Sequence, residues 1–289
     1  MTEGNVVFIH GFWSSPRTWD RLAEVLADDL DLAGLRWHRF GYASPKYSLP
    51  LWPVRIPDYD DIAQSLRPFL QQPELRGDVA IVTHSQGGLI LLRYLAWMLN
   101  EGRGAELARI RSVVLLVCPH EGTDYARSIR AVLRFGQHPQ ARALRTLDER
   151  VAAARRTVLN QVVHATAVSN RECPIPIHVY AGQTDKVVGR VTAQSSFPHA
   201  AVLPGDHFSI LDPGSPNSLT APTVKRHLVE DLKAGEQHPS VPTPDNTMPP
   251  QRSGRPTIKV QGSSGVQIGD SNTQFNTWAS TKDNEAEPE

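Results

Sequence analysis

The sequence predicts an α/β fold, a doubly wound and mostly parallel sheet with helices on both faces. Short runs that are apolar at nearly every position alternate along the chain with segments of helical spacing. Such runs are typical of parallel strands, because helices cover both faces of a parallel sheet. A later stretch has helical spacing and no strand, so we expect a helical insertion in the second half of the fold.

The expected elements follow the alternation of these patterns along the chain. The apolar runs predict strands at residues 6–10, 35–40, 79–83, 113–118, 175–181 and 200–204. The helical spacing predicts helices around residues 16–30, 58–71, 86–100 and 224–232, with the insertion at about 124–168.

The chain is expected to divide into four segments. Residues 1–234 are compatible with one large α/β domain. Residues 235–257 are rich in proline, which removes backbone donors and disfavours helix and central strand, so this segment is expected to be a flexible linker. Residues 258–280 hold a short polar motif, and residues 281–289 are an acidic end that we expect to be disordered.

Composition argues against several functional classes. The 289 residues include 30 basic and 30 acidic side chains, so no overall field attracts nucleic acid, and no nucleic-acid partner is expected. The two cysteines, and an N-terminus that lacks the pattern of a secretion signal, indicate a reducing, cytoplasmic location. The most apolar segment, residues 89–99, is far shorter than the ~20 residues needed to span a bilayer.

The stretch V-A-I-V-T-H-S-Q-G-G places Ser85 between an expected strand and an expected helix, with Gly87 and Gly88 after it. A serine on such a sharp turn is lifted above the sheet edge, and the amide of Gln86 points at the same space from a helix N-terminus. We therefore predict a nucleophile and one half of an oxyanion hole here. The alternative is an ordinary turn with a chance serine.

The loop H-G-F-W-S-S-P-R-T-W follows the first strand and lies beside the nucleophile turn in a doubly wound sheet. Gly11 lets the chain bend there, so the amide of Phe12 is the expected second oxyanion donor. Gly11 can also simply end the strand while Ser14 caps a helix with Pro16 in its first turn, and the two interpretations are compatible.

A serine hydroxyl needs an imidazole to take its proton and a carboxylate to orient that imidazole. Both should follow later strands at the same edge of the sheet. Asp185 comes just after the strand at 175–181, and His207 comes just after the strand at 200–204. The order Ser85, Asp185, His207 is the one expected for this architecture, so we predict these three as the catalytic triad.

Other histidines compete for the role of the base. His199 precedes its strand and would lie at the wrong end of the sheet. His84 should point away from the tight turn and pack under the loop, and His120 is expected to shape the pocket.

Other carboxylates compete for the role of the orienting acid. Asp206 neighbours His207 too closely in sequence to orient its ring easily. Asp124 and Glu121 remain alternatives to Asp185, because a carboxylate after the strand at 113–118 could also reach the imidazole.

The motifs H-G-F-W, T-H-S-Q-G-G, C-P-H-E-G-T, G-Q-T-D-K-V-V and G-D-H-F-S-I together resemble the α/β-hydrolase superfamily, and within it the lipase-like and GPI-inositol-deacylase-like serine esterases. The resemblance covers about residues 4–234. It implies the α/β-hydrolase fold with a sheet of the eight-stranded type, hydrolysis of acyl esters, lipid esters above all, through an acyl-enzyme on Ser85, and no cofactor. No metal site is expected, because the histidines and cysteines lack paired ligand spacing.

One position departs from the family pattern. Thr83 stands two residues before the nucleophile, where the family usually has glycine. A β-branched residue at this crowded approach of strand and helix is expected to affect the turn.

The insertion at 124–168 falls where such hydrolases carry a cap over the pocket. A basic helical cap could rest on anionic lipid head groups, which would give peripheral membrane contact in the active state. A solvated arginine-rich surface is the alternative. The arginines concerned are Arg127, Arg130, Arg134, Arg142, Arg145, Arg150, Arg155 and Arg156.

The tail contains two similar segments, G-V-Q-I-G and N-T-Q-F-N, separated by D-S. They lack proline and carry little charge, and their Asn and Gln side chains could form amide ladders if identical chains stacked in register. Val266, Ile268 and Phe275 are candidates for the dry interior of such a stack. The alternatives are a disordered polar tail and a strand that pairs with the hydrolase sheet.

This pattern resembles the pseudo-palindromic amyloid signalling motifs of bacteria and fungi, which are related to the RIP homotypic interaction motif (RHIM). The resemblance implies self-assembly and an upstream receptor with a matching motif. The sequence thus predicts a lipase-like effector of bacterial defence or cell-death signalling, against two alternatives: an inactive adaptor, and a housekeeping esterase with a passive tail. The motif residues are Val266, Gln267, Ile268, Gly269, Asn272, Thr273, Gln274, Phe275 and Asn276.

Overall fold

The computed structural model describes residues 4–11, 14–42, 59–119, 141–185, 197, 199–215 and 217–237. All of them belong to Met1–Val241, the first of the two units into which the chain divides. The amyloid motif, the acidic end and most of the expected linker lie outside the described residues. Among the described residues, no helix is both long and apolar enough to cross a membrane.

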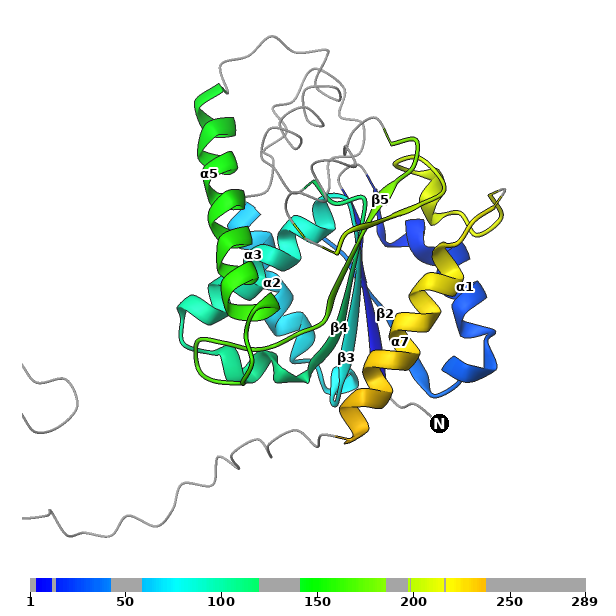
Figure 1. Ribbon diagram of the computed structural model, residues 1–289, viewed down its shortest axis with the longest axis horizontal. Helices are drawn as coiled ribbons and strands as arrows, with labels where there is room; N and C mark the ends of the chain where they lie inside the picture. The colour runs from blue at the N-terminus through cyan, green and yellow to red at the C-terminus, as the bar shows by residue number, and fades with distance from the viewer. Residues whose placement is uncertain are drawn as a thin grey trace, which may run out of the picture. The chain divides into compact units, whose positions relative to one another are not determined.

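Six parallel strands form one sheet (Figure 1). The first strand, β1, lies next to the edge strand. From β1 the chain goes to the edge strand β2, returns to β3 on the other side of β1, and then adds the remaining strands one after another. This reversal makes the sheet doubly wound, and all strand carboxyl ends lie at one edge. In order across the sheet, the strands are β2 (Leu35–Phe40), β1 (Gly4–Ile9), β3 (Val79–His84), β4 (Ile110–Leu116), β5 (Ile177–Gly182) and β6 (Ala201–Leu203).

Helices cover both faces of the sheet (Figure 1). The helices α1 (Asp20–Ala27) and α7 (Thr220–Gln237) lie on one face. The helices α2 (Tyr59–Leu70), α3 (Gln86–Asn100) and α5 (Ala141–Val158) lie on the other. Short 3-10 and π segments connect or extend these elements, namely η1 (Pro16–Trp19), η2 (Leu30–Leu32), η3 (Pro73–Leu75), η4 (Gly104–Arg109), η5 (Leu159–Val163) and η6 (Ser209–Leu211).

The core has two parts, one on each face of the sheet. Along β1, Val6 and Phe8 belong to the cluster under α1 and α7, whereas Val7 and Ile9 belong to the cluster under α2 and α3. Successive strand side chains point to opposite faces, and both faces are covered, so the strands are apolar throughout. The prediction of a doubly wound α/β fold is confirmed, and all six predicted strands are present.

Two expectations about the sheet differ from the structure. The resemblance implied an eight-stranded type of sheet, whereas the described residues form six strands. The strand predicted at 113–118 begins earlier, at Ile110. The prediction started too late because the polar Arg111 and Ser112 interrupt the apolar run. These two side chains contact Asp78 and Asp231, which offsets the cost of placing them in a strand.

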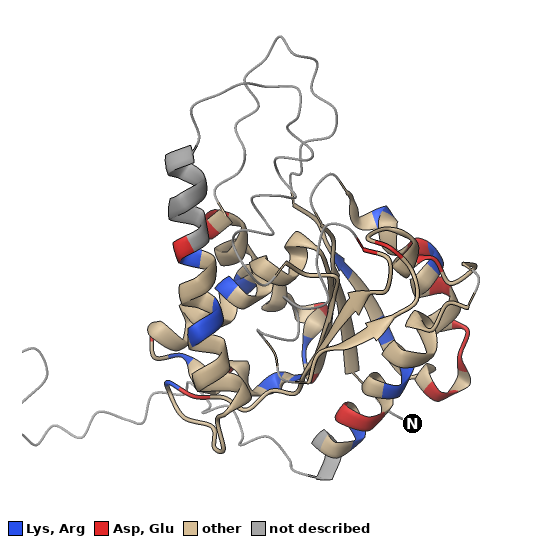
Figure 2. Cartoon of the chain, turned by 45° about the horizontal axis from the view of Figure 1, so that its top comes forward, with Lys and Arg blue, Asp and Glu red and all other residues tan. Residues whose placement is uncertain are grey.

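The second half of the expected cap is a helix of the core layer. Residues 120–140 lie outside the described residues, but α5 packs beside α3, and Val151 and Val158 belong to the main apolar cluster. Arg150 is held at 3.3 Å from Asp60 of α2, which also pairs with Arg93 of α3 at 2.6 Å. At least one of the insertion's arginines therefore ties α5 to its neighbours. Basic and acidic residues both occur on the described helices (Figure 2).

Candidate active site

Ser85 occupies a strained turn between β3 and α3. Its φ of 52° and ψ of −125° lie outside the regions that a residue with a side chain readily adopts. The turn is held from the neighbouring strand, because the Ser85 amide donates to the Leu116 carbonyl at 3.0 Å. Backbone strain of this kind is typical of a nucleophile lifted above a sheet edge.

The two glycines after Ser85 let the start of α3 approach the sheet. A Cβ atom on Gly87 would lie 2.4 Å from the Ile9 carbonyl oxygen, and one on Gly88 would lie 2.2 Å from the Cys118 sulfur. Neither distance is possible for real atoms. The sequence S-Q-G-G therefore has glycine at the two positions where a side chain would not fit. The N-terminus of α3 lies directly against the ends of β1 and β4.

Thr83 is accommodated in the space beside Gly88. Its side chain is fully buried, and its Oγ1 lies 3.4 Å from Cys118 Sγ and 3.5 Å from the Val114 carbonyl oxygen. Burial raises the pKa of the Cys118 thiol to about 12, so it stays protonated and can act as a weak donor. The departure from glycine at position 83 thus fits a threonine–cysteine contact.

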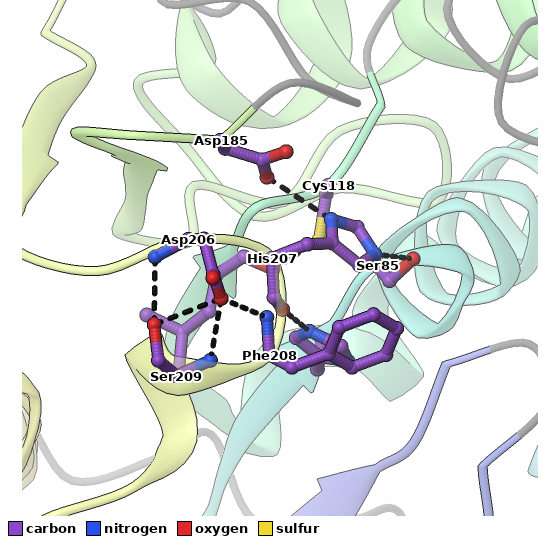
Figure 3. A network of polar contacts seen from close by, with 9 residues as sticks. Ser85, Cys118, Asp185, Asp206, His207, Phe208 and Ser209 are labelled. Atoms are coloured by element: carbon purple, nitrogen blue, oxygen red, sulfur yellow. Dashed lines mark hydrogen bonds and ion pairs between the residues drawn. The ribbon is translucent and has the colours of Figure 1, made fainter. Parts of the chain in front are cut away.

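The structure brings Ser85, His207 and Asp185 together (Figure 3). His207 Nε2 lies 2.9 Å from Ser85 Oγ, and His207 Nδ1 lies 3.0 Å from Asp185 Oδ2. The Asp185 side chain is 0% exposed and that of His207 is 13% exposed. An ionised carboxylate only accepts hydrogen bonds, so Nδ1 carries the proton and Nε2 is free to accept the proton of the serine hydroxyl.

The other acids and bases weighed from the sequence fall into two groups. His120, Glu121 and Asp124 lie outside the described residues. His199 is exposed and precedes β6, at the end of that strand remote from His207.

Asp206 shapes the loop that carries His207 through hydrogen bonds to Phe208 and Ser209. Its Oδ1 accepts from the amides of Phe208 at 3.0 Å and Ser209 at 2.8 Å, and from Ser209 Oγ at 2.8 Å (Figure 3). In return, Ser209 Oγ accepts from the Asp206 amide at 2.8 Å. These hydrogen bonds hold the pKa of Asp206 below its usual value.

Sequence reasoning missed this role. An Asp followed three residues later by a Ser at the start of η6 has the spacing of a reciprocal cap, and that signal could have identified the pair. Gly205 precedes the cap with a φ of +115°, where a side chain would be strained. Hydrogen bonds on both sides of the Asp206–Ser209 pair therefore hold the loop that carries His207, called the base loop below.

The structure describes one of the two expected oxyanion donors. Gln86 is the first residue of α3, so its amide belongs to the helix N-terminus directly after Ser85. Phe12 lies outside the described residues. The preceding residue, Gly11, packs against the nucleophile, because a Cβ atom there would lie 2.8 Å from Ser85 Cβ. The peptide after β1 thus reaches the turn that carries Ser85.

One group of side chains in the described part of the chain could in principle hold a metal ion: His178, His227 and Asp231. The two imidazole rings are stacked, with centroids 3.5 Å apart and planes 16° from parallel. Their nitrogen lone pairs therefore run side by side and do not converge on one point. His178 Nε2 lies 2.8 Å from Asp231 Oδ2, and Tyr180 OH lies 2.6 Å from His227 Nε2. We interpret this group as a polar link between α7 and β5.

A doubly wound parallel sheet with a strained serine turn, a histidine and a buried aspartate at its carboxyl edge defines a protein of the hydrolase class. The model of the alpha/beta hydrolase family matches residues 6–251, and the chain belongs to this family. No curated protein matches the sequence significantly.

Several solved structures are similar in part. ClbQ from the colibactin pathway is 16% identical with a TM-score of 0.48, over 80% of this chain and 99% of that one. The RedJ thioesterase of Streptomyces coelicolor is 15% identical with a TM-score of 0.46, over 78% and 85%. An extracellular alpha/beta-hydrolase from a Paenibacillus species is 16% identical with a TM-score of 0.43, over 79% and 98%.

Proposed function

We propose that the protein hydrolyses carboxylic esters through an acyl-enzyme on Ser85. The observation that carries the proposal is the pair of contacts that His207 makes, 2.9 Å to Ser85 Oγ and 3.0 Å to Asp185 Oδ2. Both distances are within hydrogen-bonding range, which is the geometric requirement for a base and its orienting acid.

The reaction follows from these roles. His207 Nε2 takes the hydroxyl proton as Ser85 Oγ attacks the ester carbonyl carbon, while Asp185 stabilises the imidazolium that forms. The amides of Gln86 and Phe12 are the proposed donors to the oxyanion. The intermediate collapses when His207 protonates the leaving alcohol, which leaves an acyl group on Ser85. Water then attacks the acyl-enzyme with His207 as base, and the acid is released.

An ester with an apolar acyl chain, such as a lipid ester, is the proposed substrate class. Phe208 follows the base directly in sequence, and the residue is 72% exposed. Its ring stands edge-on to the His207 ring, with centroids 5.2 Å apart. An exposed aromatic ring beside the reacting atoms supports contact with an apolar group of the substrate.

The test of the hydrolase activity uses p-nitrophenyl esters with acyl chains of increasing length, and a fluorophosphonate that labels activated serines. The full-length chain should hydrolyse the esters and take up one fluorophosphonate at Ser85, identified by peptide mass spectrometry. Ser85→Ala should abolish both. Ser65→Ala is the matched control, because Ser65 is an exposed serine on α2. An intact protein that neither reacts nor cleaves would support the inactive adaptor instead.

We further propose that residues 258–280 assemble with a matching motif on an upstream receptor and recruit the hydrolase in bacterial defence or cell-death signalling. The support is the sequence of the tail, in which two uncharged segments, each with a central Gln, flank D-S. We also propose that the arginine-rich insertion contacts anionic membranes, where the protein would act.

The tail proposal is tested with a peptide of residues 258–280. The peptide should form fibrils that bind thioflavin T, and preformed fibrils should capture the full-length protein but not a chain lacking residues 258–289. A matched peptide in which Gln267 and Gln274 are replaced by lysine should not form fibrils, because like charges would stack along the fibril. Capture of the truncated chain, or absence of fibrils, would favour a passive tail.

A further inference from the structure

His84 lies at the end of β3, directly before Ser85, and is almost completely buried, with 2% of its surface exposed. Its Nε2 atom lies 2.7 Å from the main-chain carbonyl oxygen of His207. A carbonyl oxygen can only accept a hydrogen bond, so Nε2 carries the proton and donates it. This hydrogen bond joins residues 123 positions apart.

The other side of the His84 ring faces the end of β1. Its Nδ1 is buried and, within the described part of the chain, has no hydrogen-bond partner. A Cβ atom on Gly11 would lie 3.0 Å from this nitrogen. His84 therefore fills the space between the loop that carries His207 and the loop expected to supply the second oxyanion amide.

His84 is held in its neutral form. Burial is the main cause that lowers its pKa to about 3, and the nearby His207 adds to the effect. The titratable groups that face it are His207, Asp185 and His10, and the centroids of the His84 and His207 rings are 5.1 Å apart. A cation at this distance would oppose the imidazolium that must form on His207 during ester hydrolysis. The site needs a neutral donor here, and His84 supplies one.

From this geometry, we infer that His84 is a positioning residue that places the His207 imidazole against Ser85 Oγ by holding the His207 main-chain carbonyl. The Asp206–Ser209 cap holds the same loop from its exposed side. His84 is the buried anchor, and it belongs to the strand that also carries Ser85. The positions of the nucleophile and of the base are thereby both fixed by β3. This matters because a displacement of about 1 Å can cost about 100-fold in rate.

The inference rests on the proposed function, and its test compares three substitutions in the full-length chain. His84→Gln keeps a neutral N–H donor at about the reach of Nε2. His84→Asn keeps the amide but is one methylene shorter, so it cannot reach the carbonyl. His84→Leu fills the space without a donor. We expect kcat for p-nitrophenyl esters to fall about 10- to 100-fold in His84→Asn and His84→Leu, with KM within twofold. His84→Gln should stay within about threefold of the natural chain.

A matched control separates positioning from general destabilisation. His227 is also a buried histidine held neutral, but its partners are His178, Tyr180 and Arg226. His227→Gln should lower the melting temperature and leave kcat unchanged. If His84→Leu does not fold, the comparison of His84→Gln with His84→Asn decides the matter. Equal kcat values for His84→Gln and His84→Asn would overturn the inference.

The outcome is distinguishable from failure of the proposed function. If the natural chain shows no hydrolysis that depends on Ser85, then the ester hydrolase is wrong. If the natural chain is active and a folded His84→Leu variant has the same kcat, then only the role of His84 is wrong.

Discussion

His207 Nε2 lies 2.9 Å from Ser85 Oγ, so two residues 122 positions apart share one hydrogen bond. Ser85 is fixed by a strained turn after β3, and His207 by a capped loop after β6. Two strands, β4 and β5, lie between β3 and β6 in the sheet, and the shared carboxyl edge brings the two loops together. Several consequences of this arrangement can be measured.

Asp185→Asn should lower kcat by on the order of 10³- to 10⁴-fold, because an amide at this position can favour the wrong tautomer of His207. Steady-state kinetics with p-nitrophenyl esters measures the effect. Asp124→Asn and Glu121→Gln serve as controls and should change kcat less than threefold. A loss of the size expected for Asp185 in either control would move the role of the acid to that residue.

Asp206→Ala should destabilise the protein by about 1 kcal/mol and lower kcat about tenfold, because the base loop loses three hydrogen bonds that Asp206 Oδ1 accepts. Asp206→Asn retains an acceptor oxygen and should recover most of both losses. Urea unfolding and ester hydrolysis on the same samples measure them. If alanine and asparagine behave alike, the cap does not hold the loop.

Gly87→Ala should destabilise the protein by more than about 2 kcal/mol and abolish ester hydrolysis, because its Cβ would lie 2.4 Å from a backbone oxygen that cannot move aside. Gly4→Ala is the control, since its Cβ would meet no atom closer than 3.4 Å. Thermal unfolding and kcat compare the two. A Gly87→Ala protein with natural stability would show that α3 does not approach β1 as closely as described.

The free energy of unfolding should fall as pH decreases from about 6.5 toward 4. Burial lowers the pKa of His84 to about 3 and that of His227 to about 4, against an ordinary value of 6.5. The unfolded chain therefore binds more protons in this range, and stability present at neutral pH is lost on acidification. Urea unfolding between pH 7.5 and 4.5 measures the slope.

The histidine substitutions provide the control for this pH dependence. The double variant of His84→Gln and His227→Gln should show a smaller slope, because glutamine does not titrate. His199→Gln should leave the slope unchanged, since His199 is exposed. A double variant with the natural slope would assign the acid sensitivity to other groups.

The main features of the fold could be predicted from local pattern. Runs such as V-V-F-I and V-A-I-V are apolar on both faces, which indicates strands covered by two helix layers, and G-G after a serine indicates a close strand-to-helix turn. The first residues of β4 escaped prediction because Arg111 and Ser112 are polar, and their partners Asp78 and Asp231 come from distant parts of the chain.

The chain pattern also identified Ser85, Asp185 and His207 as candidates, because the carboxyl ends of parallel strands share one edge and each residue follows a strand. The pattern could not show that His84 turns inward to hold the His207 carbonyl, or that Asp206 and Ser209 cap the same loop, because both depend on which loops meet after folding. The sequence by itself determines which side chains follow each strand. A hydrogen bond between residues 123 positions apart forms only once the sheet brings β3 and the loop after β6 close together.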